Sequence, residues 1–289
     1  MAILETKNLK FIYSIGTPFE SVAVKDISFS AGKNEIIGII GHTGSGKSTF
    51  IQHLNGLIKP TEGTVIVDGK DIWQKENKSN LRNVKFAVGL CFQYPEYQIF
   101  EDTVFDEIAF GPKQMGLDSE TVKDRVYESM KIVGLDISQK DKSPFDLSGG
   151  QKRRVAIASI IAMKPSVLIL DEPCAGLDPK GRNVILNLVK EYQQNMGNTV
   201  LFVSHSMEDV AKIADRVLVL KNGEVALFGD VDYVFSHGKQ LKEWGLNVPE
   251  VTDVFLKLKE KGIDCRTDIY TIKQAVEEYN RLSKMKEAD

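Results

Sequence analysis

Three kinds of feature are scarce in this 289-residue sequence, and each scarcity argues against a class of protein. Only three cysteines are present, Cys91, Cys174 and Cys265, and their odd number and wide spacing favour reduced thiols over a disulfide framework. The net charge of −3 lacks the basic excess that is typical of a general nucleic-acid binder. Sustained heptads are missing too, which argues against a long coiled-coil insertion.

Long hydrophobic runs are also missing. The strongest apolar runs lie at residues 36–40 and 167–170, which is strand length and far short of a bilayer span. The first residues lack the basic flank and apolar stretch of a signal peptide. We therefore expect that the chain does not cross a membrane by itself, and that any membrane role comes through a partner.

A hydrophobic content of 42% is enough for a packed core, and the length fits one large domain or one domain with an appendage. Strands alternate with helices in the periodicity, which predicts an α/β fold with parallel strand pairing. Residues 1–40 are rich in strand patterns. The sequence further predicts strands at 35–40, 64–69, 85–92, 166–170, 198–203 and 217–220, helices at 47–57, from 180 and from 206, a helical stretch at about 95–163, and a mostly helical tail from 230.

The segment Gly41-His42-Thr43-Gly44-Ser45-Gly46-Lys47-Ser48 fits the pattern G-x-x-x-x-G-K-[ST] without departure. A buried strand precedes it and a helix follows, which is the context that a phosphate-binding loop requires. Its glycines allow backbone N–H groups to point at phosphate oxygens. We expect Lys47 to neutralise phosphate charge and Ser48 to offer a hydroxyl to Mg²⁺. The alternative is an ordinary glycine-rich turn.

Two carboxylates, Asp171 and Glu172, end the apolar run at 167–170. Ligands of open α/β sheets bind at the carboxyl ends of central strands. Adjacent strand residues point to opposite sides, so the two carboxylates cannot share one task. Phosphoryl transfer needs such a division, because positioning the metal and positioning the water are separate tasks.

The run Leu147-Ser148-Gly149-Gly150-Gln151 lies between these two elements. The three elements in this order resemble the ATP-binding cassette (ABC) ATPases, in which this run of one cassette closes on ATP held by the glycine loop of another. The resemblance implies an ABC ATPase cassette at 1–229: a P-loop NTPase core with an N-terminal antiparallel β-subdomain and a helical insert at about 95–163. It also implies a helical C-terminal extension at 230–289.

Residue roles follow from the same resemblance. It implies that Lys47, Gln93, Glu172 and His205 are catalytic, with Glu172 acting on the attacking water and His205 contacting the γ-phosphate. Ser48, Gln93 and Asp171 are expected to hold Mg²⁺. Tyr13 matches the aromatic that stacks on adenine, although it could also be a plain strand aromatic. Further nucleotide contacts are implied for Gly41, His42, Thr43, Gly44, Ser45, Gly46, Thr49 and, from the opposite cassette, Ser148, Gly149, Gly150, Gln151 and Asp178.

Residues 92–100 and 54–57 are similar to the ATPase (A) components of energy-coupling factor (ECF) transporters, most of all to the second of the two paralogous A subunits. This resemblance implies an ATPase that energises the import of vitamins or transition-metal ions. Its expected partners are a paralogous second A subunit, a transmembrane T component and, through the complex, a substrate-binding S component. We expect it peripherally on the cytoplasmic face of the cell membrane. The imported solute is not encoded in this chain.

Two other classes of protein stay open. One is a soluble ABC ATPase, such as an iron–sulfur assembly factor, and the other is a regulatory nucleotide-binding module without turnover. Intact Lys47, Asp171, Glu172 and His205 argue against the second class.

The sequence also predicts two features of the surface. Glu96 and Glu101, in the segment after Gln93, are expected to be exposed carboxylates that pair with arginines of the T component; alternatively, Glu96 lies in a solvated turn. The tail carries Val251, Val254, Phe255 and Leu258 at helical spacing. This apolar stripe predicts either a dimer contact or packing on the chain's own core.

Overall fold

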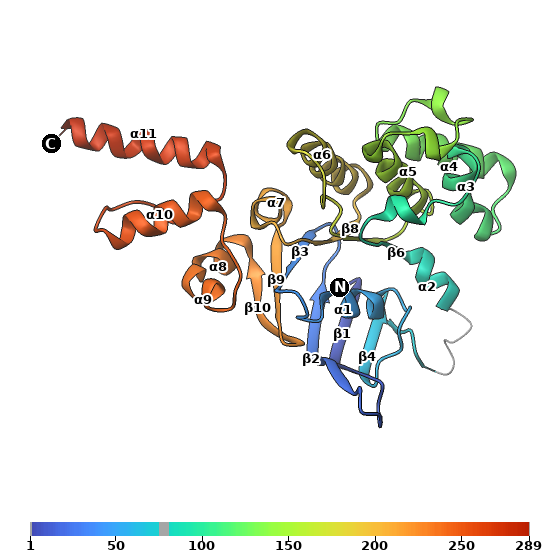
Figure 1. Ribbon diagram of the computed structural model, residues 1–289, viewed down its shortest axis with the longest axis horizontal. Helices are drawn as coiled ribbons and strands as arrows, with labels where there is room; N and C mark the ends of the chain where they lie inside the picture. The colour runs from blue at the N-terminus through green and yellow to red at the C-terminus, as the bar shows by residue number, and fades with distance from the viewer. Residues whose placement is uncertain (1, 75–80, 289) are drawn as a thin grey trace.

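The computed structural model describes residues 2–74 and 81–288, with side chains through Lys284. Its strands form one ten-stranded sheet in the order β5-β4-β1-β2-β10-β9-β3-β8-β7-β6 (Figure 1). The strands are β1 (Leu4–Tyr13), β2 (Ser21–Ala31), β3 (Ile36–Ile40), β4 (Glu62–Val67), β5 (Lys70–Asp71), β6 (Val88–Cys91), β7 (Val167–Asp171), β8 (Thr199–Val203), β9 (Arg216–Lys221) and β10 (Glu224–Asp230).

The helices alternate with the strands of the core and then continue alone to the C-terminus. They are α1 (Lys47–Leu54), α2 (Leu81–Ala87), α3 (Val104–Gln114), α4 (Ser119–Ile132), α5 (Gly149–Ile161), α6 (Pro179–Met196), α7 (Met207–Ile213), α8 (Val231–Ser236), α9 (Gly238–Glu243), α10 (Glu250–Glu260) and α11 (Ile272–Ala288), with 3₁₀ helices η2 (Pro95–Gln98), η3 (Ile137–Gln139) and η4 (Pro144–Asp146). The prediction of an α/β fold is confirmed.

The centre of the sheet is parallel. Strands β3, β7 and β8 are five-residue segments in which every residue is buried, and they pair in parallel with one another and with β6 and β9. Strands buried on both faces read as continuous apolar runs, which is why the sequence showed no alternation there. The carboxyl ends of these strands meet at one edge of the sheet.

Two apolar clusters cover the two faces of this parallel sheet. Ile36 and Ile40 point into the first cluster, together with the helices of the insert, whereas Ile37 and Ile39 point into the second, together with Phe50 of α1. This alternation follows from the period of two along a strand. Both clusters are therefore anchored on β3, the strand that leads into the glycine loop.

An antiparallel layer extends the sheet on the N-terminal side. Strands β1, β2, β4 and β5 pair antiparallel, and β2 joins the rest of the sheet through one parallel pair, Asp26 with Glu224 of β10. The register of β1 against β2 shifts three times, and such irregularities bend and twist a strand locally. The predicted N-terminal antiparallel β-subdomain is confirmed.

One strand boundary differs from the sequence prediction. The strand expected at 85–92 begins only at Val88, because residues 81–87 form helix α2. Leu81 and Val84 both pack on the second apolar cluster, and their spacing of three suits a helix. The helix expected to reach residue 57 ends at Leu54, where Gly56 turns the chain with a φ of +71°.

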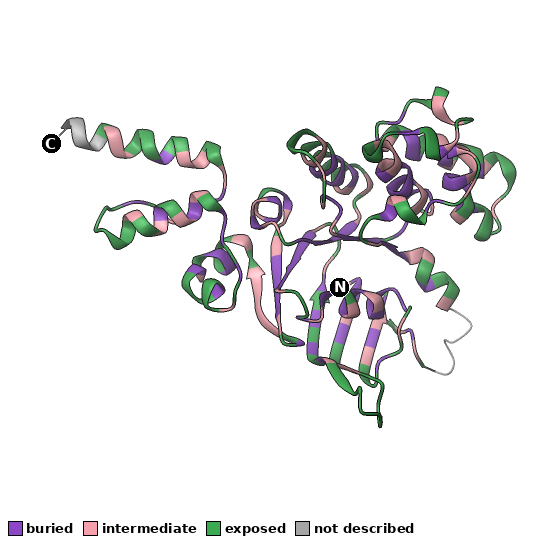
Figure 2. Cartoon of the chain, viewed as in Figure 1, coloured by how far each residue is buried: buried purple, intermediate pink, exposed green. Residues whose placement is uncertain are grey.

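The helical insert and the end of the chain lie on opposite sides of the molecule (Figure 1). In the last sixty residues, α8 and α9 bury Val234, Phe235 and Leu241 in the main core. Helices α10 and α11 project beyond it, mostly with exposed surface, and share a small cluster of their own around Phe255, Cys265 and Ile269 (Figure 2). The predicted boundary at 230 thus falls before two helices that pack on the cassette.

The four residues of the apolar stripe in the tail lie in different environments in the structure. Val251, Phe255 and Leu258 pack into the cluster between α10 and α11, while Val254 is 54% exposed. These contacts favour the alternative in which the stripe packs on its own chain. Dimerisation through the extension stays a prediction.

Candidate functional site

The glycine loop connects β3 to α1 and depends on two of its glycines. A Cβ at Gly46, where φ is +97°, would lie 2.5 Å from the Ala23 carbonyl oxygen. A Cβ at Gly41 would lie 2.4 Å from the Leu220 carbonyl oxygen. Backbone from β2 and β9 therefore closes on the loop from outside, and only glycine fits at these two positions.

Lys47, the first residue of α1, folds back over the loop. Its ammonium group donates to the Gly41 carbonyl at 2.6 Å and to the His42 carbonyl at 3.1 Å. Burial lowers the pKa of Lys47, while the nearby carboxylates of Glu172 and Asp171 act in the opposite direction. The loop thus holds a fixed cation at the helix N-terminus, which is the electrostatic setting that an anion such as phosphate prefers.

Asp171 ends strand β7 beside this cation. Burial raises the pKa of Asp171, whereas Lys47 and a hydrogen bond from the Ser48 side chain lower it. The hydroxyl of Ser48, the carboxylate of Asp171 and the amide of Gln93 supply the oxygen donors that Mg²⁺ prefers, and all three side chains line one cavity. No group of three acidic, histidine or cysteine side chains suited to a metal occurs in the described part of the chain. These residues fit a metal that is completed by phosphate oxygens and water.

Glu172 follows in a left-handed conformation with a φ of +49°, and it lines the same cavity as Asp171. Its backbone N–H donates to the Val203 carbonyl of the neighbouring strand β8 at 3.0 Å. Burial raises the pKa of Glu172 to about 7, although a hydrogen bond from the His205 backbone and the positive charge of Lys47 act to lower it. A carboxylate with a pKa near neutrality is suited to accept a proton.

His205 lies just beyond the end of β8, and its Nε2 is 3.4 Å from Oε1 of Glu172. Burial lowers the pKa of the imidazole, and so does the positive charge of Lys47. The sequence prediction that the strand before His205 lies beside the strand of Asp171 is confirmed by the parallel pairing of β7 and β8.

These side chains surround a cavity of about 370 Å³. The structure brings together most of the predicted residues there and adds three from β2 that the sequence analysis missed. The cavity is lined by the predicted Tyr13, Thr43, Gly44, Gly46, Lys47, Ser48, Thr49, Gln93, Asp171, Glu172 and His205, and by the unforeseen Ser21, Val22 and Ala23. Tyr13 is 40% exposed, and its hydroxyl lies 3.1 Å from the Thr49 hydroxyl.

Several predicted residues do not line this cavity. Gly41, His42 and Ser45 belong to the loop but lie outside the lining. Ser148, Gly149, Gly150, Gln151 and Asp178 are placed elsewhere on the surface. The Ser148 hydroxyl accepts from the Gln151 backbone and the Gln151 side chain accepts from the Ser148 backbone, which fixes the start of α5.

The prediction for Glu96 is wrong. Its carboxylate is not exposed, because it accepts two hydrogen bonds from the buried guanidinium of Arg153, at 3.0 and 2.6 Å. Burial raises the pKa of Glu96, but the hydrogen bonding and positive charge of Arg153, together with a hydrogen bond from the Glu96 backbone, lower it overall. Glu96 is half-buried and already paired, so it is not a free partner for an external arginine.

Comparisons with known proteins agree with this geometry. Residues 24–175 match the ABC transporter family. The energy-coupling factor transporter ATP-binding protein EcfA2 of Caldanaerobacter subterraneus subsp. tengcongensis is 52% identical over 274 residues, which cover 95% of each chain. The chain belongs to the ABC transporter family, within its energy-coupling factor ATP-binding proteins.

Two solved structures support the fold. The structure of cbiO1 from Clostridium perfringens, part of the ABC transporter complex cbiONQ, is 36% identical with a TM-score of 0.73 and covers 84% of this chain and 94% of its own. The dimeric ATP-binding cassette MJ0796, in a post-hydrolysis state with ADP and Pi, is 28% identical with a TM-score of 0.69, covering 79% of this chain and 98% of its own. The expected ABC ATPase cassette is confirmed.

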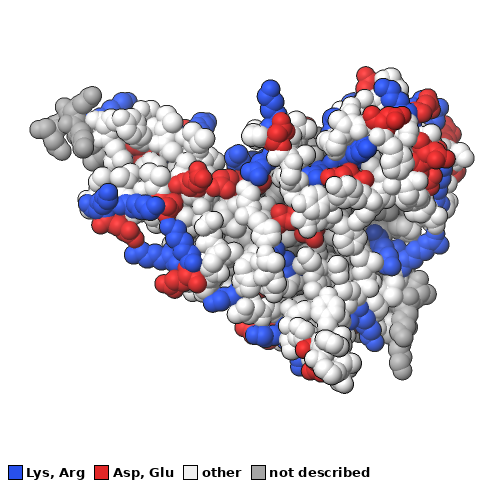
Figure 3. Space-filling model, in the orientation of Figure 1, with Lys and Arg blue, Asp and Glu red and all other residues white. Residues whose placement is uncertain are grey.

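Within residues 2–74 and 81–288, no helix is long and apolar enough to span a bilayer. On the face shown in Figure 3, acidic and basic side chains interleave, in keeping with the small net charge.

Proposed function

We propose that the chain binds MgATP in the cavity between the glycine loop and the ends of β7 and β8. One observation carries this proposal: Lys47, Ser48, Gln93, Asp171, Glu172 and His205, which come from four segments of the sequence, line one cavity. Bound nucleotide supplies the phosphoryl group, and Mg²⁺ supplies charge neutralisation. Lys47 holds the phosphates, Asp171 and Ser48 hold the metal, Glu172 accepts the proton of the attacking water, and His205 keeps Glu172 in place.

We further propose that hydrolysis needs a second cassette. Ser148 and Gly149 begin α5 on the surface, and a Cβ at Gly149 or Gly150 would meet no atom within 4 Å. The absence of side chains at these exposed positions suits a close approach to a phosphate held by another molecule. The partner of this proposal is a paralogous A subunit, giving a heterodimer.

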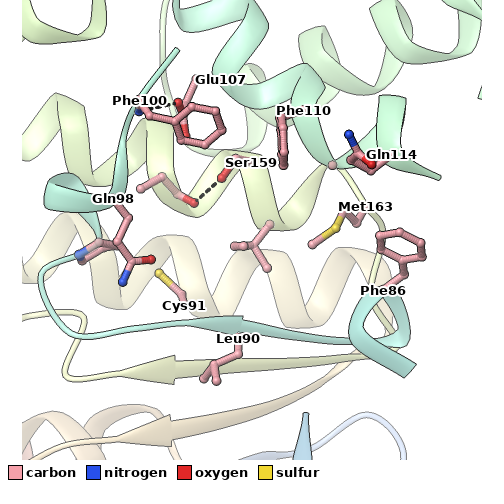
Figure 4. A pocket seen from close by; sticks show the side chains of 14 residues that line it. Phe86, Leu90, Cys91, Gln98, Phe100, Glu107, Phe110, Gln114, Ser159 and Met163 are labelled. Atoms are coloured by element: carbon pink, nitrogen blue, oxygen red, sulfur yellow. Dashed lines mark hydrogen bonds between the residues drawn. The ribbon is translucent and has the colours of Figure 1, made fainter. Parts of the chain in front are cut away.

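A groove beside the insert is the proposed docking site for a transmembrane component. It has a volume of about 300 Å³ and opens between β6, η2, α3 and α5 (Figure 4). Phe100 and Phe110 flank it with ring centroids 5.0 Å apart, and they are 59% and 41% exposed. Glu107 fixes the rim, because its carboxylate accepts from the Phe100 and Glu101 backbones at 3.1 Å each.

Exposed aromatic rings around an apolar groove are typical of a docking surface for a helix. In this proposal the chain is peripheral, on the cytoplasmic face of the membrane, and its membrane partner binds in the groove. A separate substrate-binding subunit selects the solute, a vitamin or a transition-metal ion. A soluble ABC ATPase would not need a docking groove for a membrane partner. The similarity of this chain to energy-coupling factor transporter ATP-binding proteins also favours the transporter subunit.

Co-purification tests the proposal. The chain is co-expressed with a paralogous A subunit and a T component, and phosphate release from MgATP is measured in the purified complex. We expect Phe110→Asp to reduce the yield of complex while nucleotide binding stays intact. Phe145→Asp is the matched control, because Phe145 is a similarly exposed aromatic, 58%, outside the groove. Equal yields from both variants would exclude the groove as the docking site.

A further inference from the structure

Arg153 joins three segments of the molecule through one buried side chain. It lies on α5, is 3% exposed, and binds both carboxylate oxygens of Glu96 on η2. Its remaining nitrogen, Nη1, donates to the carbonyl of Pro173 at 3.1 Å and to that of Ala175 at 2.6 Å. Four hydrogen bonds from one planar group therefore fix α5, η2 and the loop after Glu172 in one geometry.

The segments that Arg153 joins belong to two different sites. Pro95 and Gln98 of η2 line the docking groove, whereas Pro173 directly follows Glu172 of the nucleotide cavity. Tyr94 lies between the two sites. Its ring is 6.0 Å from the Arg153 guanidinium carbon, and it follows Gln93, which lines the nucleotide cavity.

Stability alone does not account for this arrangement. Buried ion pairs are often no more stabilising than apolar side chains of the same volume, because both charges lose their hydration. A bidentate pair instead fixes the relative orientation of its two side chains. Glu96 cannot shift relative to Arg153 without breaking charge-assisted bonds, so η2 and the carbonyls of Pro173 and Ala175 move together.

We propose that Glu96 and Arg153 are positioning residues that form a coupling strut between the docking groove and the loop that carries Glu172. The inference rests on the proposed function, since it needs a membrane partner in the groove. Occupation of the groove shifts η2, and the strut carries that shift to the backbone after Glu172. The reverse also holds, because coupling between two sites is reciprocal: nucleotide in the cavity alters the groove through the same contacts.

The experiment compares phosphate release from MgATP by the full-length cassette pair with release by the same pair assembled with the T component. Their ratio is the stimulation by the membrane partner. The variants are Arg153→Lys, Glu96→Gln and the double substitution. Arg154→Lys is the matched control, because the neighbouring Arg154 also binds two backbone carbonyls, those of Val133 and Gly134, but both lie within the insert.

We expect Arg153→Lys and Glu96→Gln each to reduce the stimulation by about fivefold or more, in line with typical coupling between sites. The yield of assembled complex should stay at the wild-type level, which a merely structural defect would not predict. The double variant should be no worse than the more impaired single variant, because both remove one shared contact. Arg154→Lys should keep the wild-type stimulation.

Three results would overturn the strut: wild-type stimulation in both single variants, additive losses in the double variant, or an equal loss in Arg154→Lys. Thermal unfolding of each variant checks the fold. Glu96→Gln decides the question if Arg153→Lys does not fold, since it keeps both carbonyl bonds of Arg153. A wild-type pair that the T component neither binds nor stimulates would instead refute the proposed function. The inference about Glu96 and Arg153 would then be refuted as well, because it depends on that function.

Discussion

Nε2 of His205 lies 3.4 Å from Oε1 of Glu172, although the two residues are distant in the sequence. The parallel pairing of β7 with β8 brings them together, because both follow strand ends at the same edge of the sheet. Oε1 of Glu172 is buried and makes no hydrogen bond within the part of the chain that the structure describes. That oxygen is thus available as an acceptor, with the imidazole beside it to hold the carboxylate in place.

The first prediction concerns Glu172→Gln. The amide keeps the shape of the side chain but cannot accept a proton, so phosphate release should fall by about a hundredfold or more. MgATP binding should persist, since Lys47 and Ser48 are unchanged, and a closed ATP-bound dimer should accumulate. Phosphate release and sedimentation of the purified complex measure the two effects. Near-normal turnover would remove Glu172 from its proposed role.

The second prediction concerns Lys47→Ala. Loss of the ammonium that is held by the Gly41 and His42 carbonyls should weaken nucleotide binding itself, by roughly tenfold or more, because contacts to charged groups are the stronger ones. Titration with a fluorescent ATP analogue measures the dissociation constant. Lys113→Ala is the control, since Lys113 forms an exposed ion pair with Asp106 outside the cavity. Equal affinity in both variants would contradict the proposed contact.

Much of the site could be predicted because its residues are local in the sequence. The glycine loop is one continuous segment between a strand and a helix, and Asp171 and Glu172 directly follow an apolar run. Such signals need no knowledge of long-range contacts. His205 was predicted from the resemblance to the ABC ATPases, and the expectation that its strand lies beside that of Asp171 supported this prediction.

The features that the sequence did not predict depend on long-range contacts. Val22 and Ala23 line the cavity from β2, and nothing in the sequence of this strand indicates that the glycine loop lies beside it. Glu96 was predicted to be exposed because nothing in its own segment indicates Arg153, which lies 57 residues away. Helix α2 was missed for a related reason, since Leu81 and Val84 fit a helix only once their packing on the second apolar cluster is known.

The third prediction concerns two truncations. A chain that ends at Pro249 loses α10, α11 and the segment between them, which form a cluster of their own and reach the main core through Leu256 and Tyr270, and it should still unfold cooperatively. A chain that ends at Asp230 also loses buried Val234, Phe235 and Leu241, each worth about 1.5–3 kcal/mol of burial, and should be much less stable. Thermal denaturation followed by circular dichroism compares them. Equal stability of the two truncated chains would show that α8 and α9 do not belong to the cassette core.

The last prediction concerns acid sensitivity of the extension. Glu278 on α11 is buried, and its carboxylate accepts from Nε and Nη2 of Arg281 at 2.8 and 2.6 Å and from the Arg266 backbone at 2.8 Å. The hydrogen bonds from Arg281 are the main cause that lowers the pKa of Glu278, to about 2. A carboxylate whose pKa is lower in the folded state stabilises that state above its ordinary pKa and loses this effect as the pH falls toward the lowered value.

We therefore expect the packing of α11 on the segment around Arg266 to be fully stable above about pH 4.5 and to loosen as the pH falls toward 2. Glu278→Gln should destabilise this packing already at pH 7, by about 1–3 kcal/mol, and should remove most of its pH dependence. Hydrogen exchange of the α11 amides between pH 7 and 3, corrected for intrinsic rates, measures both effects. Glu277→Gln is the control, because Glu277 is an exposed neighbour on the same helix. If wild type and Glu278→Gln lose protection in parallel as the pH falls, the acid sensitivity of the extension arises from other carboxylates.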